Sequence, residues 1–290
     1  MLGWSRWKAG RRPLAAMVAL MIAGVTLWVL VSQETNKERS MTSQREEARA
    51  SAVTVAELAR VSRTRVFFGH QSVGMNILEG ASSVYAAGGM TAPPIGEGAV
   101  PGSEGGFIDH AFIGENGNPQ LKIQDFAAKL RAGLGERVDV AMMKLCYVDI
   151  TSGTDVRAVF DAYRNAMTAL RREFPRVTFI YVTVPLTTQP GLLSKVKSLL
   201  TGSGGSAADN AARERFNALI RHEYAGDHVF DLAAAESTAP DGGRVAGTYD
   251  GQRYYGLYDG YASDPGHLNA EGAQVAAAAW LAAIAQASPR

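Results

Sequence analysis

Short apolar runs alternate with amphipathic helical patterns from about residue 51 to the end of this 290-residue chain. Successive parallel strands need a long crossover connection, usually a helix, so this alternation is typical of a layered α/β fold. We therefore predict a three-layer α/β/α sandwich with a mainly parallel sheet and no internal repeat. The expected strands are 66–68, 138–146, 177–184 and 228–232, and the expected helices are 155–174, 211–224 and 270–287, the last with Asn269 as its N-cap.

Three stretches follow neither the helical nor the strand period. Residues 88–119 are rich in glycine and proline, residues 201–209 in glycine and serine, and residues 236–264 hold five of the ten tyrosines. Long irregular segments in a compact domain usually carry function. We predict substrate contacts for Tyr254 and Tyr255, because tyrosine offers both a stacking face and a hydroxyl. The alternative is that these rings only cover the sheet.

The N-terminal segment has the pattern of a membrane anchor. Basic residues within 1–13 precede an uncharged, mostly apolar stretch of about 18 residues from Leu14 to Val31, the lower end of the length that spans a bilayer. A cleavable signal peptide has a shorter apolar core and a small-x-small site, and none follows directly. We expect a transmembrane anchor at 14–32, a charged linker at 33–50 and an extracytoplasmic domain at 51–290, periplasmic or at the cell surface.

The charge of the expected domain argues against nucleic acid as a partner. The whole chain has a net charge of +1, residues 1–32 carry four basic and no acidic side chains, and residues 33–50 carry four of each. Residues 51–290 are therefore left with a net charge of −3, whereas nucleic-acid-binding domains are usually basic. The single cysteine, Cys146, excludes an intramolecular disulfide, so the fold must be stable without one.

Two segments at opposite ends of the domain carry the strongest chemical pattern. The first, 67–74, reads Phe-Phe-Gly-His-Gln-Ser-Val-Gly, an apolar run that enters a turn displaying Ser72. The second, 263–269, reads Ser-Asp-Pro-Gly-His-Leu-Asn and places Asp264 three residues before His267. A carboxylate at this spacing orients an imidazole whose other nitrogen takes a proton from a serine hydroxyl. The two segments together predict a serine-hydrolase triad.

These two segments resemble the SGNH hydrolases, also called the GDSL esterase/lipase superfamily. The family begins with a strand and a Gly-Asp-Ser block and ends with an Asp-x-x-His block before the last helix; the order of elements agrees over about 64–287. The resemblance implies that Ser72 is the nucleophile, His267 the general base and Asp264 the carboxylate that orients it. It also implies an SGNH/flavodoxin-like sandwich that acts on esters without a cofactor.

The chain departs from the family pattern in two blocks. Gly-His-Gln-Ser replaces Gly-Asp-Ser, and residues 146–149 read Cys-Tyr-Val-Asp where the family has Gly-x-Asn-Asp, so the asparagine that helps bind the oxyanion is missing. We expect Gly114 or Asn116 to supply the second oxyanion donor. Loss of one such donor costs on the order of 10²–10³ in rate.

Several of these residues have structural alternatives. Ser72 would also serve as the cap of a helix that begins near Val73, and His267 as a buried histidine bonded to Asp264. His70 either donates to a substrate oxygen or fixes the turn. Asp149 either lies at a helix N-terminus or holds Lys144 or His70. We expect Lys144, inside an apolar run, to pair with a carboxylate.

Metal and nucleotide chemistry have no recognisable pattern here. No two of the five histidines have the spacing of a zinc site, and neither a phosphate-binding loop nor a dinucleotide fingerprint is present. The sequence therefore predicts a membrane-anchored serine esterase that removes an O-acyl group from a glycan or another envelope polymer. An O-acyltransferase is one alternative, since a sugar hydroxyl in place of water would accept the acyl group. The other is a non-catalytic module that binds a glycan or a partner.

Overall fold

The computed structural model describes residues 53–98, 105–189 and 205–289. The predicted anchor at 14–32 and the linker at 33–50 lie outside the described residues. Among the helices that are described, none combines the length and the apolar character needed to cross a membrane.

The described part of the chain is built around a sheet of six parallel strands in the order β2-β3-β1-β4-β5-β6. The central strand β1 pairs with β3 on one side and with β4 on the other. The four strands predicted from the sequence are confirmed, although β4 is shorter than expected. The bounds are Arg65–His70 for β1, Ile95–Glu97 for β2, Phe107–Phe112 for β3, Val140–Met143 for β4, Thr178–Val182 for β5 and His228–Phe230 for β6.

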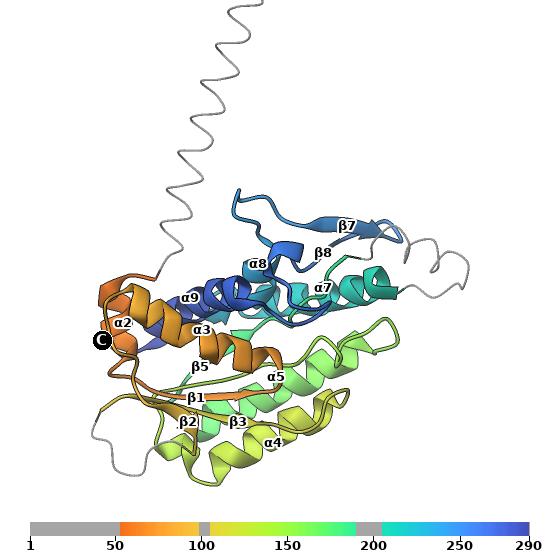
Figure 1. The fold of residues 1–290 in the computed structure, drawn as a ribbon. Helices are drawn as coiled ribbons and strands as arrows, with labels where there is room; N and C mark the ends of the chain where they lie inside the picture. The colour runs from red at the N-terminus through yellow and green to blue at the C-terminus, as the bar shows by residue number, and fades with distance from the viewer. Residues whose placement is uncertain (1–52, 99–104, 190–204, 290) are drawn as a thin grey trace, which may run out of the picture. The chain divides into compact units, whose positions relative to one another are not determined.

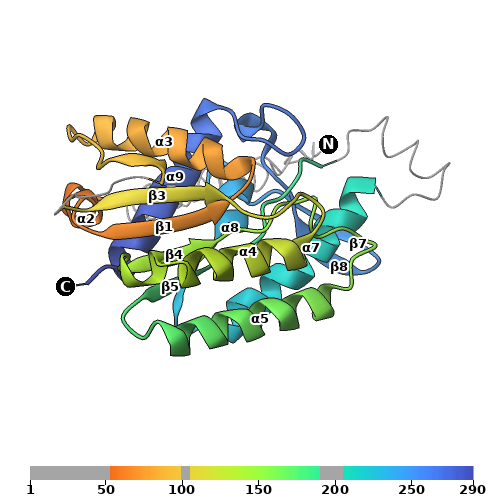
Figure 2. The same ribbon diagram turned by 90° about the horizontal axis from the view of Figure 1, so that it is seen from below.

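Helices cover both faces of the sheet, which confirms the three-layer sandwich (Figures 1 and 2). One apolar core lies between the sheet and α2, α3, α8 and α9, and a second lies between the sheet and α4, α5 and α7. These helices are Val55–Val61 (α2), Val73–Ala87 (α3), Leu232–Ser237 (α8), Ala270–Ala287 (α9), Pro119–Arg131 (α4), Val156–Glu173 (α5) and Gly205–Glu223 (α7).

Strand β1 belongs to both cores because its side chains alternate. Val66 and Phe68 face the α3 and α9 side, Phe67 faces the α4 and α5 side, and all three are fully buried. A strand buried on both faces reads as a continuous apolar run, which is why it was recognisable in the sequence. Burial of each such side chain contributes about 1.5–3 kcal/mol, so the strand that leads to Ser72 is firmly held.

Two of the three predicted helices begin where expected, whereas α7 begins at Gly205, six residues before the predicted start at residue 211. Asp155 caps α5 by accepting a hydrogen bond from the N–H of Ala158 at 3.0 Å. Asn269 caps α9 by accepting from the N–H of Gly272 at 3.0 Å, as expected. Helix α9 packs along α3, so it places the segment before residue 270 beside the start of α3.

All three stretches expected to be irregular contain regular structure, and residues 205–209 of the stretch 201–209 belong to α7. Residues 88–119 include β2 and β3, and 236–264 include an antiparallel hairpin of β7 (Ala246–Tyr249) and β8 (Gln252–Tyr255). In β3 the polar residues Asp109 and His110 interrupt the apolar pattern. Both are nevertheless buried, since Asp109 accepts from the N–H of Gly98 at 3.0 Å and His110 bonds to a histidine of β1.

The carboxyl ends of the central strands meet at one edge of the sheet. From β1 the chain goes to β2 and β3 on one side and then to β4 on the other, which is the topology that opens a crevice at this edge. Ser72 follows β1, Gly114 follows β3 and Tyr147 follows β4. The sheet thus gathers three of its loops at one place.

Candidate active site

Ser72 lies in the turn that joins β1 to α3, with φ of 44° and ψ of −103°. A positive φ is costly for a residue with a side chain, about 1–3 kcal/mol, and such strain concentrates at functional sites. Ser72 occupies the N-cap position of α3, but its side chain makes no capping hydrogen bond. Its Oγ is instead bonded to Nε2 of His267. The alternative that Ser72 caps the helix through its hydroxyl is therefore wrong.

His267 is held between Ser72 and Asp264. Its Nδ1 lies 2.7 Å from Oδ2 and 3.0 Å from Oδ1 of Asp264. The backbone N–H groups of Gly266 and His267 both donate to Oδ1 at 2.9 Å. The turn Asp264-Pro-Gly-His267 thus fixes the carboxylate by its own backbone, and the carboxylate fixes the imidazole.

The electrostatics of this turn keep Asp264 ionised. The hydrogen bond from the N–H of Gly266 and the bonds from His267 hold the pKa of Asp264 below its usual value. An ionised carboxylate on Nδ1 leaves Nε2 as the proton acceptor that faces Ser72 Oγ. About a third of the His267 side chain and half of the Asp264 side chain are exposed, so the alternative of a buried structural histidine is wrong. The arrangement can take a proton from a serine hydroxyl within reach of solvent.

The segment after β3 is tied to the serine turn. The amide Nε2 of Gln71 donates to the carbonyl oxygens of Ile113 and Gly114, both at 3.1 Å. Gly114 has a φ of 50°, and its N–H donates to Oδ2 of Asp125 at 2.9 Å. That N–H is therefore committed to Asp125, and the expectation that Gly114 offers it to an oxyanion does not fit this structure.

Asn116 has the opposite property, because no partner of its amide N–H groups is found in the described part of the chain. Its Oδ1 accepts a hydrogen bond from Nζ of Lys122 at 2.9 Å, and the residue is exposed. An ammonium group only donates, so the amide oxygen must face Lys122 and the NH₂ group must point away from it. Asn116 is thus oriented as a hydrogen-bond donor.

Asp149 forms a fully buried ion pair with Lys122, with Nζ and Oδ2 2.6 Å apart. The carboxylate also accepts from the N–H of Gly117 at 2.8 Å and from the N–H of Cys146 at 2.6 Å. The expectation that Asp149 begins a helix or holds Lys144 or His70 is wrong, since its partners are these three. The pair joins the segment after β3 to the segment after β4.

His70 is completely buried beneath the serine turn. Its Nε2 lies 3.1 Å from Nδ1 of His110, and a Cβ added to Gly74 would lie 2.4 Å from its ring. Burial, reinforced by the nearby charge of Lys144, lowers the pKa of His70 from 6.5 to about 3. These contacts favour the interpretation that His70 fixes the turn over the one in which it touches substrate.

The depressed pKa of His70 predicts a loss of stability in acid. Between about pH 6.5 and pH 3 the unfolded chain binds a proton that the folded chain excludes, so the free energy of unfolding falls as the pH falls. The slope from one such group is at most about 1.4 kcal/mol per pH unit. Urea unfolding at several pH values should show a weaker dependence for His70→Gln than for the native chain. Parallel curves would contradict the assignment.

Lys144 is also completely buried, at the end of β4. Its Nζ lies 3.4 Å from both the carbonyl oxygen of Leu145 and the Sγ of Cys146. No ion pair of Lys144 within 4.0 Å is found among the described residues, contrary to the expectation of a carboxylate partner. The nearby Glu236 is buried too, and burial raises its pKa to about 8 although the charge of Lys144 opposes this.

The predicted tyrosines lie on β8 and are not joined to the triad by any described contact. Tyr254 is 3% exposed and packs against Gly247. Tyr255 lies under the guanidinium of Arg244, 3.5 Å from the ring centroid. The alternative that these rings cover the underlying fold fits these contacts better than a role in binding substrate.

A tyrosine that the sequence reasoning overlooked does contact the triad. The ring of Tyr147 meets the ring of His267 edge to face at 5.8 Å, and it packs against the backbone of Gly266. Tyr147 lies inside the 146–149 block where the family asparagine is missing. That position in the sequence was the signal that could have identified Tyr147 as a residue of the site. Gln71 and Lys122 were overlooked as well, because their roles depend on contacts across loops.

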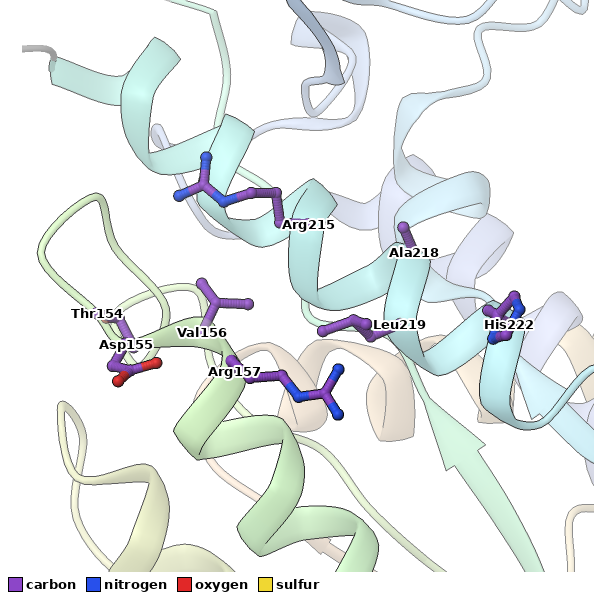
Figure 3. Close-up of a pocket in the computed structure, with 8 residues that line it drawn as sticks. All are labelled: Thr154, Asp155, Val156, Arg157, Arg215, Ala218, Leu219 and His222. Atoms are coloured by element: carbon purple, nitrogen blue, oxygen red, sulfur yellow. The ribbon is translucent and has the colours of Figure 1, made fainter.

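An open groove with a volume of about 730 Å³ lies elsewhere, between the N-terminal end of α5 and the outer face of α7 (Figure 3). It is lined by residues such as Val156, Arg157 and Leu219, and by none of the predicted site residues. Among the described residues, no cluster of three or more histidine, cysteine, aspartate or glutamate side chains is arranged to hold a metal ion.

Comparisons with known proteins give similarity at the level of solved structures. No protein-family model matches the chain, and no curated protein matches it. A protein described as a candidate SGNH hydrolase from Slackia heliotrinireducens is 13% identical, with a TM-score of 0.45, and the match covers 75% of this chain and 97% of that one.

Two further solved structures are similar at comparable levels. A catalytic mutant of an acetylxylan esterase from Geobacillus stearothermophilus is 13% identical, with a TM-score of 0.42, over 77% of this chain and 94% of that one. The periplasmic domain of a lipopolysaccharide acetyltransferase from Salmonella ser. Paratyphi A is 13% identical, with a TM-score of 0.38. The match covers 74% of this chain and 81% of that one. One of the solved structures to which this chain is similar is described as a candidate SGNH hydrolase, and this is the family that the Ser72 and His267 segments resemble.

Proposed function

We propose that this protein is a serine esterase of the SGNH type that removes an O-acyl group from a glycan or another envelope polymer. The observation that carries the proposal is the continuous hydrogen-bonded path from Ser72 Oγ through the His267 ring to Asp264. The strained backbone of Ser72 supports it, because a structural cap would have no need of that strain. In this proposal residues 14–32 anchor the protein and residues 51–290 act outside the cytoplasm.

The reaction proceeds in two acyl-transfer steps. Ser72 Oγ attacks the ester carbonyl carbon while His267 Nε2 takes the serine proton. The tetrahedral intermediate collapses, the C–O bond to the leaving alcohol breaks, and His267 returns the proton to that oxygen. Water, deprotonated by His267, then attacks the acyl-serine, and the second collapse releases the carboxylic acid and Ser72.

The oxyanion of both intermediates is stabilised by Asn116 and by the backbone at the start of α3. The N–H of Ser72 stands at the N-terminus of this helix, where the helix dipole favours negative charge. The amide of Asn116 is turned away from Lys122 and stands on the segment that Gln71 ties to the serine turn. Asn116 therefore takes the part of the asparagine that is absent from residues 146–149.

Replacing Asn116 with aspartate keeps the side-chain volume and removes the two donors. We expect kcat for an ester substrate to fall by about 10²-fold, as for the loss of one oxyanion donor elsewhere, with little change in KM. Asn116→Ala should lose a similar factor. Steady-state kinetics of both variants test the assignment, and a native kcat in a folded Asn116→Ala would exclude Asn116 as a donor.

Exposed apolar side chains flank the serine turn and suit an acylated substrate. Phe112 ends β3 and is 45% exposed, and Val148 follows β4 and is 38% exposed. Both strands are direct neighbours of β1, which leads to Ser72. These side chains offer an apolar surface to an acyl group or to the apolar face of a sugar ring.

The proposed function is tested with p-nitrophenyl acetate and with an O-acetylated polysaccharide. The native protein should release p-nitrophenol and acetate, and Ser72→Ala should release neither above the uncatalysed rate. Adding a sugar acceptor separates hydrolysis from transfer, because transfer yields a newly acetylated sugar in place of free acetate. A native protein that binds the polysaccharide without releasing acetate would support the binding module instead.

A further inference from the structure

Arg213 on α7 is a buried cation with an unusual set of partners. Its side chain is 3% exposed, and no ion pair of Arg213 within 4.0 Å is found in the described part of the chain. Its Nε donates to the carbonyl oxygens of Tyr147 at 2.9 Å and Ile150 at 3.1 Å. Its Nη1 donates to Thr187 Oγ1 at 2.9 Å and to Asn210 Oδ1 at 2.7 Å. The hydrogen-bond partners of this guanidinium are all neutral oxygens, and the carboxyl groups of Asp209 and Glu236 act on it without a direct ion pair. Burial of such a cation is costly, so its contacts need an explanation.

The first segment that Arg213 holds leads to His267. The guanidinium binds the carbonyl oxygen of Tyr147 and lies 5.7 Å from the centroid of the Tyr147 ring. That ring meets the His267 imidazole edge to face and packs so closely on Gly266 that a Cβ there would lie 2.5 Å from Cζ of Tyr147. A shift of Tyr147 must therefore move either the imidazole or the turn that carries it.

The second segment leads to the same turn from its other side. Arg213 binds the hydroxyl of Thr187, and Asn210 adds hydrogen bonds to the backbone N–H and the carbonyl oxygen of Thr187 at 3.1 and 2.8 Å. The next residue, Thr188, donates its N–H to the carbonyl oxygen of Pro265 at 2.8 Å. Arg213 thus binds two of the segments that contact residues 264–267, and the serine turn is a third.

These contacts matter because the side chains of Asp264 and His267 lie outside the core, although the next residue, Leu268, is buried in it. The side chains of Asp264 and His267 are substantially exposed, and the turn lies between η2 (Asp259–Tyr261) and the start of α9. We propose that Arg213 is a positioning residue for the hydrolysis proposed above, holding His267 in line with Ser72 through Tyr147 and Thr187. Displacement of a reacting group by about 1 Å is enough to cost on the order of 10² in rate.

Arg213→Ala and Arg213→Lys test this role, with p-nitrophenyl acetate as the substrate. We expect kcat for Arg213→Ala to fall by about 10²-fold while KM changes little. Methylguanidinium in the buffer should restore part of the loss in Arg213→Ala, because the cavity left by the side chain accepts the guanidinium head group. Arg213→Lys keeps the charge but cannot make the hydrogen bonds to both Tyr147 and Thr187, so its kcat should remain low.

Arg221 provides the matched control on the same helix. Its guanidinium binds Asp231 and Glu214, and it contacts neither Tyr147 nor Thr187. Arg221→Ala should keep the native kcat even though it loses two ion pairs. Tyr147→Leu should reproduce the slow rate of the Arg213 variants, because it removes the ring that meets the His267 imidazole. Urea unfolding establishes that each variant compared is folded.

The outcomes separate this proposal from the esterase proposal. A native kcat in folded Arg213→Lys together with a native kcat in Tyr147→Leu overturns the positioning role while leaving the esterase intact. If the native protein hydrolyses no ester, the esterase proposal fails, and positioning is then read from the His267 imidazole resonances. Arg213→Lys should shift these resonances, and Arg221→Ala should not. Unshifted resonances in Arg213→Lys would overturn the proposal in that case too.

Discussion

His267→Ala is expected to lower the kcat for ester hydrolysis by at least about 10⁴-fold, because Ser72 then lacks its proton acceptor. The Nε2 of His267 is the group bonded to Ser72 Oγ, and within the described residues no other imidazole is bonded to it. Ser72→Ala should lose a comparable factor. The measurement is kcat/KM for p-nitrophenyl acetate in purified, folded variants.

The double variant gives the sharper result. If Ser72 and His267 act as one unit, the Ser72→Ala/His267→Ala variant should be no slower than either single variant. Asp264→Asn should lose about 10⁴-fold, because the amide favours the wrong tautomer of the imidazole. His222→Ala, on the exposed face of α7, serves as the control and should keep the native rate. Losses that multiply in the double variant would mean that the two residues act separately.

Asp149→Ala is expected to lower the free energy of unfolding by about 3–5 kcal/mol, because it leaves the Lys122 ammonium buried without its counter-ion. Both side chains of this pair are 0% exposed, and two backbone N–H groups lose their acceptor as well. Urea unfolding of the native chain and the variant measures the difference. A loss this large would be a substantial part of the stability of most domains.

Two further variants show whether the effect arises from a buried charge. Lys122→Met/Asp149→Asn removes both charges and keeps an oxygen for the backbone donors, so it should be more stable than Asp149→Ala. Arg176→Met breaks the exposed pair with Glu136 and should change stability little. Equal losses for Asp149→Ala and Arg176→Met would contradict the account of this ion pair.

Much of the layer architecture was predictable because burial leaves a trace in local sequence. Strand β1 is buried on both faces and therefore reads as a run of apolar residues. Helix α5 repeats its buried positions at helical spacing, and Asp155 marks its start. Strand β3 has no continuous apolar pattern, because it contains Asp109 and His110. The hydrogen-bond partners of these two side chains come close only in the folded sheet.

The same distinction between local sequence and long-range contact applies to the residues of the candidate site. Asp264 and His267 belong to one turn, so their spacing alone predicted their contact. The pairing of Lys122 with Asp149, and of Arg213 with Tyr147, joins segments far apart in the chain, and no local pattern announces it. For Gly114 the sequence indicated the glycine turn. It did not indicate that the N–H of Gly114 donates to Asp125.

The most direct test of the central claim is the identity of the residue that a fluorophosphonate modifies. The protein is treated with the probe, digested, and its peptides are mapped by mass spectrometry, with Ser72→Ala and His267→Ala treated in parallel. The account predicts one phosphonyl adduct on Ser72 in the native protein and none in either variant. No adduct on the folded native protein, or an adduct on another serine that survives in Ser72→Ala, would contradict it.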